Sequence, residues 1–251
     1  MSLKNSIKYY LAIFNQCINK QKFILILIFS IVAGGLGAIS GMEITYFESF
    51  LISINDSYYI MFLLLLLFIN TKNTIDVFKE NYFYIIRLNS KKEYINKLIK
   101  TTIINNLIII LLNFIILIIW RNLFGFNGAT YSIKNYTFHY SIYLIYCIIK
   151  LILITSAISS LNILLLLKIK YRYVLIFNCL LCILPTVISN YYYNINSIIK
   201  IPLSPTSQIM SLGTYYNSFI SEILFFIIYF VIFLIIIDIL KKICLKYLGD
   251  L

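Results

Sequence analysis

The sequence predicts an all-α integral membrane protein with six transmembrane helices. Of its 251 residues, 61% are hydrophobic and only 12% are charged, and the mean hydropathy is +0.92. Soluble domains are about 45–50% apolar and about 25% charged, so this composition argues against a soluble enzyme, a disordered tail or a secreted disulfide scaffold. The length suits about six spans of ~20 residues with short loops. We therefore expect one transmembrane domain over residues 1–251.

Continuous apolar runs define the six expected spans. In chain order they cover residues 23–41, 54–70, 101–120, a span within 138–167, 171–190 and 219–240. The runs do not alternate with polar residues, which excludes strands. The second run is the weakest, because its dense part at 58–69 would reach only about 18 Å and must borrow flanking residues. A cleaved signal peptide is the alternative for the first run, but 22 residues precede it, which favours a retained span.

The distribution of basic residues sets the expected orientation. Seventeen lysine and arginine residues lie in the N-terminal segment, the loops at 71–100 and 168–172, and the C-terminal tail at 241–251. The alternate loops carry only three, Arg121, Lys134 and Lys200. By the positive-inside rule both termini are cytoplasmic, and the six-helix membrane domain covers residues 23–240.

The N-terminal segment, residues 1–22, has the pattern of an amphipathic helix. Apolar residues recur at helical spacing, while lysine and asparagine occupy another face; the apolar residues are Leu3, Ile7, Leu11, Phe14 and Ile18. This pattern predicts a helix that lies in the cytoplasmic interface. The alternative is a basic anchor that only sets the topology.

The cytoplasmic loop at 71–100 is long for so compact a chain. An apolar face at Ile75, Phe78, Tyr82 and Ile85 predicts a short amphipathic helix, with charged residues around it. Ser90 followed by Glu93 forms a capping box, which starts a long helix into the third run after a break at 88–89. We interpret this loop as a docking element for a soluble partner. The alternative is a solvated basic loop.

The outer loop at 191–218 is too apolar for a solvated loop and too interrupted for a span. It contains Pro202 and Pro205 among tyrosine, isoleucine, serine and asparagine residues. A re-entrant or interfacial hairpin fits this pattern. A flexible tyrosine-rich loop at the headgroups is the alternative.

A few polar or small residues interrupt the apolar runs. The candidate cavity-lining residues are Asn106, Asn113, Thr155, Ser159 and Asn162. We favour the other interpretation of them, as hydrogen-bond partners between helices. Gly37 and Gly41 form a G-x-x-x-G pattern, which suits a packing or dimer face or, equally, flexibility near the outer end of the first run.

Two charged residues need a separate interpretation. We expect Lys150 to lie at the outer surface and to extend its ammonium group to the interface, if the fourth span covers 151–167. The alternative is a buried lysine that meets an anionic cargo or partner. Asp238 has a structural role, because it can pair with Lys241 or Lys242 at helical spacing.

The residue inventory argues against an enzyme or a metal centre. His139 is the only histidine, so a histidine-rich metal site is impossible. Cys179 and Cys182 form a C-x-x-C pattern inside an apolar run, and we interpret them as plain buried thiols rather than zinc or redox ligands. The net charge of +12 follows membrane topology and gives no indication of nucleic-acid binding.

The overall plan resembles an ABC-2-type permease, the membrane subunit of certain ABC transporters. The segment at 78–100, FKENYFYIIRLNSKKEYINKLIK, is similar to the stretch where that family carries an acidic residue, a coupling helix and a serine-plus-basic pair. The small size resembles bacterial permeases for antimicrobial peptides, bacteriocin immunity or similar amphipathic cargo.

The resemblance implies two kinds of partner, one of which binds ATP in place of this chain. A separate ATP-binding subunit would dock on 74–97 and carry ATP and Mg²⁺, because the chain lacks a P-loop pattern and binds no cofactor itself. The contacts to that subunit would come from Phe78, Glu80, Tyr82, Arg87, Ser90 and Lys91. A second permease chain, identical or a sibling, would complete the pathway in the lipid bilayer.

Two alternatives from other classes remain. The chain could be a membrane scaffold or sensor without transport, or a stand-alone secondary transporter, which would usually show intramembrane charges and repeated halves. The high content of Ile, Asn, Lys and Tyr suggests an AT-rich genome, and hence a multi-pass protein of a bacterial cytoplasmic membrane.

Overall fold

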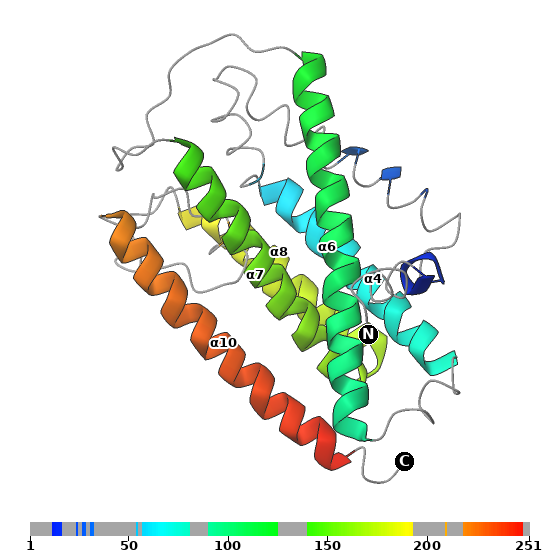
Figure 1. Cartoon of the computed structure of the whole chain (residues 1–251). Helices are drawn as coiled ribbons and strands as arrows, with labels where there is room; N and C mark the ends of the chain where they lie inside the picture. The colour runs from blue at the N-terminus through cyan, green and yellow to red at the C-terminus, as the bar shows by residue number, and fades with distance from the viewer. Residues whose placement is uncertain are drawn as a thin grey trace.

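The computed structural model of the chain is a bundle of long helices (Figure 1). It describes residues 12–16, 57–80, 90–124, 140–192 and 218–247, together with 24, 27–28, 31–32, 54 and 209. Every long element in these ranges is an α-helix, which confirms the predicted all-α class for this part of the chain. The long helices are α4 (Ser57–Glu80), α6 (Lys91–Phe124), α7 (Tyr140–Leu166), α8 (Tyr171–Tyr192) and α10 (Phe219–Tyr247).

Four of these helices are long and apolar enough to cross a bilayer. The candidate spans are Tyr59–Glu80, Lys91–Ile119, Ile142–Leu166 and Phe219–Lys246, and a shorter apolar stretch covers Tyr171–Leu181. They overlap the second, third, fourth and sixth predicted runs, although the first two candidate spans extend about ten residues beyond their runs toward the loop at 71–100. Most of the first run, most of residues 1–22 and most of the loop at 191–218 lie outside the described residues. The chain is an all-α membrane-embedded protein.

Helix α4 is longer than its apolar run. Its 24 residues extend for about 36 Å and continue to Glu80, so residues 75–80 are not a separate cytoplasmic helix, as the sequence suggested, but the last turns of α4. The reason lies in Thr71 and Thr74, whose hydroxyls donate to the carbonyls of Leu67 and Asn70 one turn back, at 2.7 and 2.9 Å. These polar side chains therefore need no loop to satisfy them. The predicted break at 88–89 lies outside the described residues.

Helix α6 begins where the sequence predicts. The Ser90 hydroxyl accepts a hydrogen bond from the Glu93 amide at 3.2 Å, and the Ser90 carbonyl accepts one from the Tyr94 amide at 3.1 Å. This is an N-cap. The helix has 34 residues, or about 51 Å, which exceeds the roughly 30 Å of a hydrocarbon core. Its exposed, charged first turn, with Lys91, Lys92 and Glu93, can therefore project beyond the bilayer.

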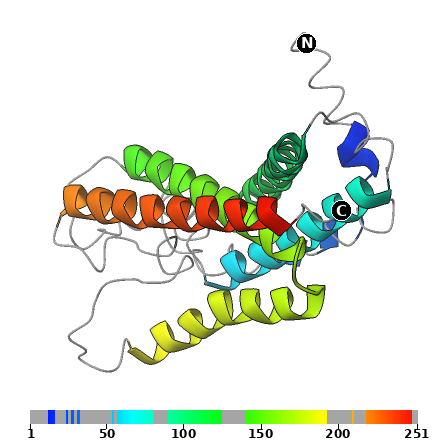
Figure 2. The same cartoon turned by 90° about the horizontal axis from the view of Figure 1, so that it is seen from below.

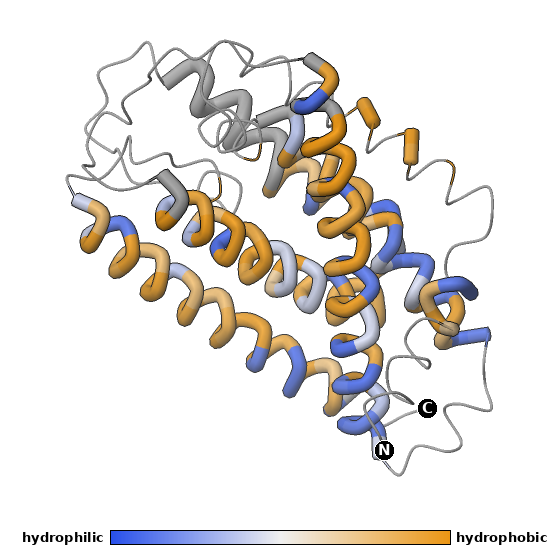
Figure 3. Tube along the Cα trace, turned by 45° about the horizontal axis from the view of Figure 1, so that its top comes forward, coloured by the Kyte–Doolittle hydropathy of each residue, from blue (hydrophilic) through white to orange (hydrophobic). Residues whose placement is uncertain are grey.

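Helix α7 is the centre of the bundle. It packs against each of the other four long helices, whereas α10 packs chiefly on α7. A tight turn follows it, in which the Ile169 amide donates to the Leu165 carbonyl at 2.7 Å, and α8 begins at Tyr171. Seen from below, α8 and α10 run along separate sides of the bundle (Figure 2). Apolar residues cover most of the helix surfaces, and polar ones gather toward the end that holds the start of α6 and the end of α10 (Figure 3).

Candidate functional site

Among the described residues, a group of buried polar side chains lies where α4, α6 and α7 meet. Asn106 of α6 is its hub: its amide nitrogen donates to the Ser159 hydroxyl at 2.7 Å and to the Thr71 hydroxyl at 3.3 Å. Its amide oxygen accepts a hydrogen bond from the Asn70 amide at 2.7 Å. Each of these four side chains is at most 2% exposed. We call this group, together with Thr74 and Asn105, the amide cluster.

The amide cluster lies deep in the bundle. Asn70 and Asn106 both fall close to the middle of their candidate spans. Next to Asn106, the Asn105 amide donates to the hydroxyl of Thr74, one turn beyond Asn70 on α4, at 3.4 Å. Polar groups in hydrocarbon must find partners within the protein, so these contacts fix how α4, α6 and α7 face one another.

The five candidate cavity-lining residues are not all brought together. Asn106 and Ser159 meet in the amide cluster, whereas Asn162 pairs reciprocally with Asn178 of α8 at 3.0 and 2.8 Å. Asn113 and Thr155 bond carbonyls of their own helices, Ile109 at 2.9 Å and Leu151 at 2.7 Å. The interhelical interpretation therefore describes Asn106, Ser159 and Asn162, and a cavity-lining role stays a prediction.

Five of the eight side chains that make these interhelical contacts were not predicted from the sequence. Asn70, Thr71 and Thr74 were assigned to the end of a run and a loop, because mean hydropathy falls there. Their spacing of one, three and four residues could have indicated a polar helical face. Asn105, which directly precedes Asn106, and Asn178 are polar residues inside apolar runs, a signal that was present but not used.

A buried ion pair joins α7 to α10. The Lys150 ammonium donates to a Glu222 carboxylate oxygen at 3.0 Å, and the two side chains are 0% and 1% exposed. The Tyr143 hydroxyl donates to the same carboxylate at 3.1 Å. The Lys150 nitrogen also lies 5.1 Å from the centre of the Tyr146 ring, within the range of a cation–π contact.

This pair overturns the expected position of Lys150. The lysine does not lie at the outer surface, because the candidate span of α7 already begins at Ile142 and α10 brings a carboxylate against it. An ionisable pair inside a membrane span is costly and is a functional candidate by default. The predicted pairing of Asp238 is confirmed: its carboxylate lies 2.7 Å from the Lys242 ammonium, and both side chains are exposed.

The residues expected to contact an ATP-binding subunit have different environments. Phe78 is only 3% exposed and packs edge-on against Tyr94, with ring centres 6.2 Å apart. Glu80, Ser90 and Lys91 are exposed. Tyr82, Arg87 and the glycines Gly37 and Gly41 lie outside the described residues. The contact of Phe78 with Tyr94 ties the end of α4 to the start of α6.

Neither a metal site nor a known relative adds to this description. In the described ranges, no group of three His, Cys, Asp or Glu side chains could hold a metal ion. No family model, curated protein or solved structure matches the chain.

We predict that Asn106→Leu destabilises the bundle by about 1–2 kcal/mol, because it removes contacts worth about 0.6 kcal/mol each and leaves buried partners unsatisfied. Asn113→Leu is the matched control: the same substitution at a buried position of the same helix, where the amide bonds only a carbonyl of its own helix. Unfolding by sodium dodecyl sulfate in mixed micelles measures both. Equal effects of the two substitutions would contradict the interhelical role of Asn106.

We predict that Glu222→Gln lowers the free energy of unfolding by about 3–5 kcal/mol, because it leaves a buried ammonium group without its counter-charge. The double variant Glu222→Gln with Lys150→Met should recover much of that loss, since it removes both charges together. The same unfolding assay gives the coupling energy between the two positions. Additive effects would show that the two side chains do not form a pair in the folded protein.

Proposed function

We propose that this chain is the membrane-spanning permease subunit of an ATP-driven exporter in a bacterial cytoplasmic membrane. In this proposal it has six spans and cytoplasmic termini, and it moves a peptide, antibiotic or other amphipathic cargo. The support comes from the charge distribution, the resemblance of 78–100 to the ABC-2 permeases, and the described helices.

One observation carries the proposal furthest: α6 runs unbroken from an exposed, charged first turn to the amide cluster. Ser90 caps that first turn, and Asn106 lies on the same helix about 24 Å farther along its axis. A helix transmits a displacement of its end along its length. A force on the first turn therefore reaches the contacts that hold α6 against α4 and α7.

The end of α4 and the start of α6 together form a surface suited to a soluble partner. Phe78 and Tyr94 hold the end of α4 beside the start of α6. The exposed residues around this contact carry both signs of charge; they are Lys79, Glu80, Lys91, Lys92 and Glu93. In the proposal an ATP-binding subunit, carrying ATP and Mg²⁺, docks here and shifts the bundle between two packings.

Helix α10 supplies a surface for the second permease chain. Only 6% of its most apolar stretch is buried in the bundle, and its outer face exposes large residues such as Ile228, Ile232 and Ile235. Either lipid or a second chain covers this face in the membrane. A homodimer or a heterodimer with a sibling fits the proposal equally.

The buried ion pair favours a second candidate, a stand-alone secondary transporter. Such proteins carry paired ionisable residues within their spans, and Lys150 with Glu222 is such a pair. Ion-dependent uptake by the purified chain alone, in vesicles without any ATPase, would favour this candidate over the permease.

The permease proposal predicts that the tagged chain, purified from its native membranes in mild detergent, brings a stoichiometric P-loop ATPase. Alanine at Lys79, Glu80, Lys91 and Lys92 should release that ATPase, because these side chains form the exposed surface on which it would dock. The matched control is alanine at Lys168, Lys170 and Arg172, which are also exposed and basic and lie at the turn between α7 and α8.

Mass spectrometry of the purified material identifies the partner. If the chain comes out alone while other membrane complexes stay intact, the permease proposal is wrong. If both sets of substitutions release the ATPase equally, the proposed docking surface is wrong.

A further inference from the structure

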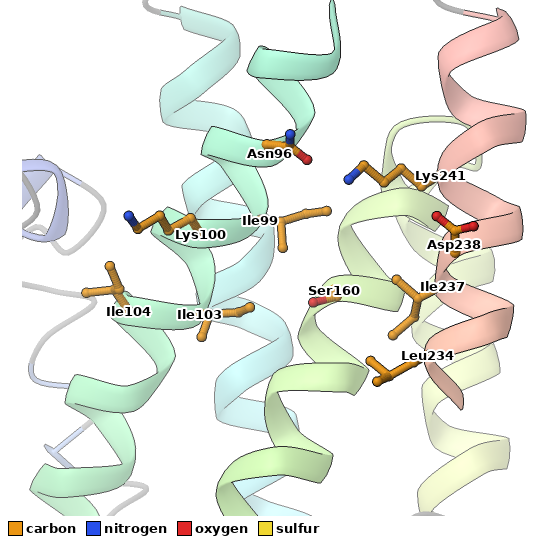
Figure 4. A pocket seen from close by; sticks show the side chains of 10 residues that line it. All are labelled: Asn96, Ile99, Lys100, Ile103, Ile104, Ser160, Leu234, Ile237, Asp238 and Lys241. Atoms are coloured by element: carbon orange, nitrogen blue, oxygen red, sulfur yellow. The ribbon is translucent and has the colours of Figure 1, made fainter. Parts of the chain in front are cut away.

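A groove of about 400 Å³ separates α6 from α10 above the surface of α7 (Figure 4). Its apolar part is lined by Ile99 and Ile103 of α6 and by Leu234 and Ile237 of α10. Its polar part is lined by Asn96 and Lys100 on one side and by Asp238 and Lys241 on the other. The groove therefore changes from apolar to polar along the helix axes.

The polar part lies toward the charged end of the bundle. Asn96 is in the second turn of α6, and Lys241 is in the last two turns of α10. Beyond them, Ile95, Leu164 and Cys244 form a small apolar cluster, in which the Cys244 thiol donates to the Leu164 carbonyl at 3.4 Å. This cluster holds α6, α7 and α10 together, so the groove ends there and opens sideways.

The charges around the polar part suit an anion. Lys241 extends from α10 across the gap toward Asn96, whereas Lys100, although part of the lining, points its ammonium group away from the gap (Figure 4). The one carboxylate there, Asp238, lies 2.7 Å from the Lys242 ammonium, which offsets its charge. Lysines supply point charges for phosphate, and an amide such as that of Asn96 can donate a hydrogen bond to it.

We propose that this groove binds one anionic phospholipid of the cytoplasmic leaflet. Its phosphate lies between Lys241 and Asn96. The part of one acyl chain nearest the headgroup lies along Ile99, Ile103 and Leu234. Basic pockets between transmembrane helices on the cytoplasmic side recognise acidic headgroups in this way. The leaflet follows from the excess of basic residues at this end. The inference does not depend on the proposed transport function.

The test is native mass spectrometry of the purified chain, titrated with phosphatidylglycerol and with phosphatidylcholine of the same acyl chains. We expect one tightly held lipid and a preference of about tenfold for phosphatidylglycerol. Lys241→Gln should weaken phosphatidylglycerol binding about fivefold, the factor that corresponds to about 1 kcal/mol per basic residue near an anionic group. Lys246→Gln is the matched control, because Lys246 is exposed on the same helix and does not line the groove.

A second pair of variants tests the apolar part without changing charge. Ile103→Trp should fill the groove and weaken binding of both lipids. Leu111→Trp, at a position of α6 that is 58% exposed and lies outside the groove, should have no effect. Both proteins must elute and melt as the unaltered chain does, which separates loss of the site from loss of the fold.

Three results would overturn the proposal: equal affinity for the two lipids, equal effects of Lys241→Gln and Lys246→Gln, or unchanged binding in Ile103→Trp. Competition by glycerophosphoglycerol, the headgroup without acyl chains, distinguishes the sources of phosphate. If it displaces the lipid at the same concentration, the groove is a site for soluble phosphates and not for a lipid. If it does not displace the lipid, the result supports a site for the intact phospholipid.

Discussion

Polar contacts between helices determine how this bundle packs, because apolar surface alone gives helices little preference for one another over lipid. Three side chains of α7 each bond a different neighbour: Lys150 bonds Glu222 of α10, Ser159 accepts from Asn106 of α6, and Asn162 pairs with Asn178 of α8. Each partner is buried. A shift of any neighbour along α7 would leave polar groups unsatisfied in hydrocarbon, which is costly. These three contacts therefore set the position of the surrounding helices along α7.

The same contacts offer a route from the charged end of the bundle to its interior. The first turn of α6 is exposed, and the contact of Phe78 with Tyr94 joins it to the end of α4. Farther along, Asn106 bonds residues of both α4 and α7. Close-packed interiors change between discrete arrangements rather than deforming continuously. A partner that moves this end would thus act on the amide cluster as a unit, which is the mechanical basis of the permease proposal.

The sequence predicted what depends on neighbouring residues along the chain. The helical class, the cap at Ser90 and the pairing of Asp238 with Lys242 all follow from hydropathy or from spacings of three and four residues. Lys150 was misplaced because its partner lies 72 positions away, and periodicity shows a face without showing what covers it. The polar residues from 70 to 74 were taken for a loop for the same reason: their partners on α6 are 31 to 36 positions away. Tyr82, Arg87, Gly37 and Gly41 lie outside the described residues, so their roles stay predictions.

The most direct test of the coupling claim is a distance measurement between spin labels in the chain with its co-purified ATPase. One label replaces Leu111, which is 58% exposed on α6 and lies outside the docking surface, and the other replaces exposed Lys246 at the end of α10, in a variant whose native cysteines are replaced. The account predicts that this distance differs between the nucleotide-free and ATP-trapped states. A pair at Leu111 and Leu123, both exposed on α6, should keep its distance, because the helix moves as a rigid body. An unchanged distance between α6 and α10 in a complex that hydrolyses ATP would contradict the account.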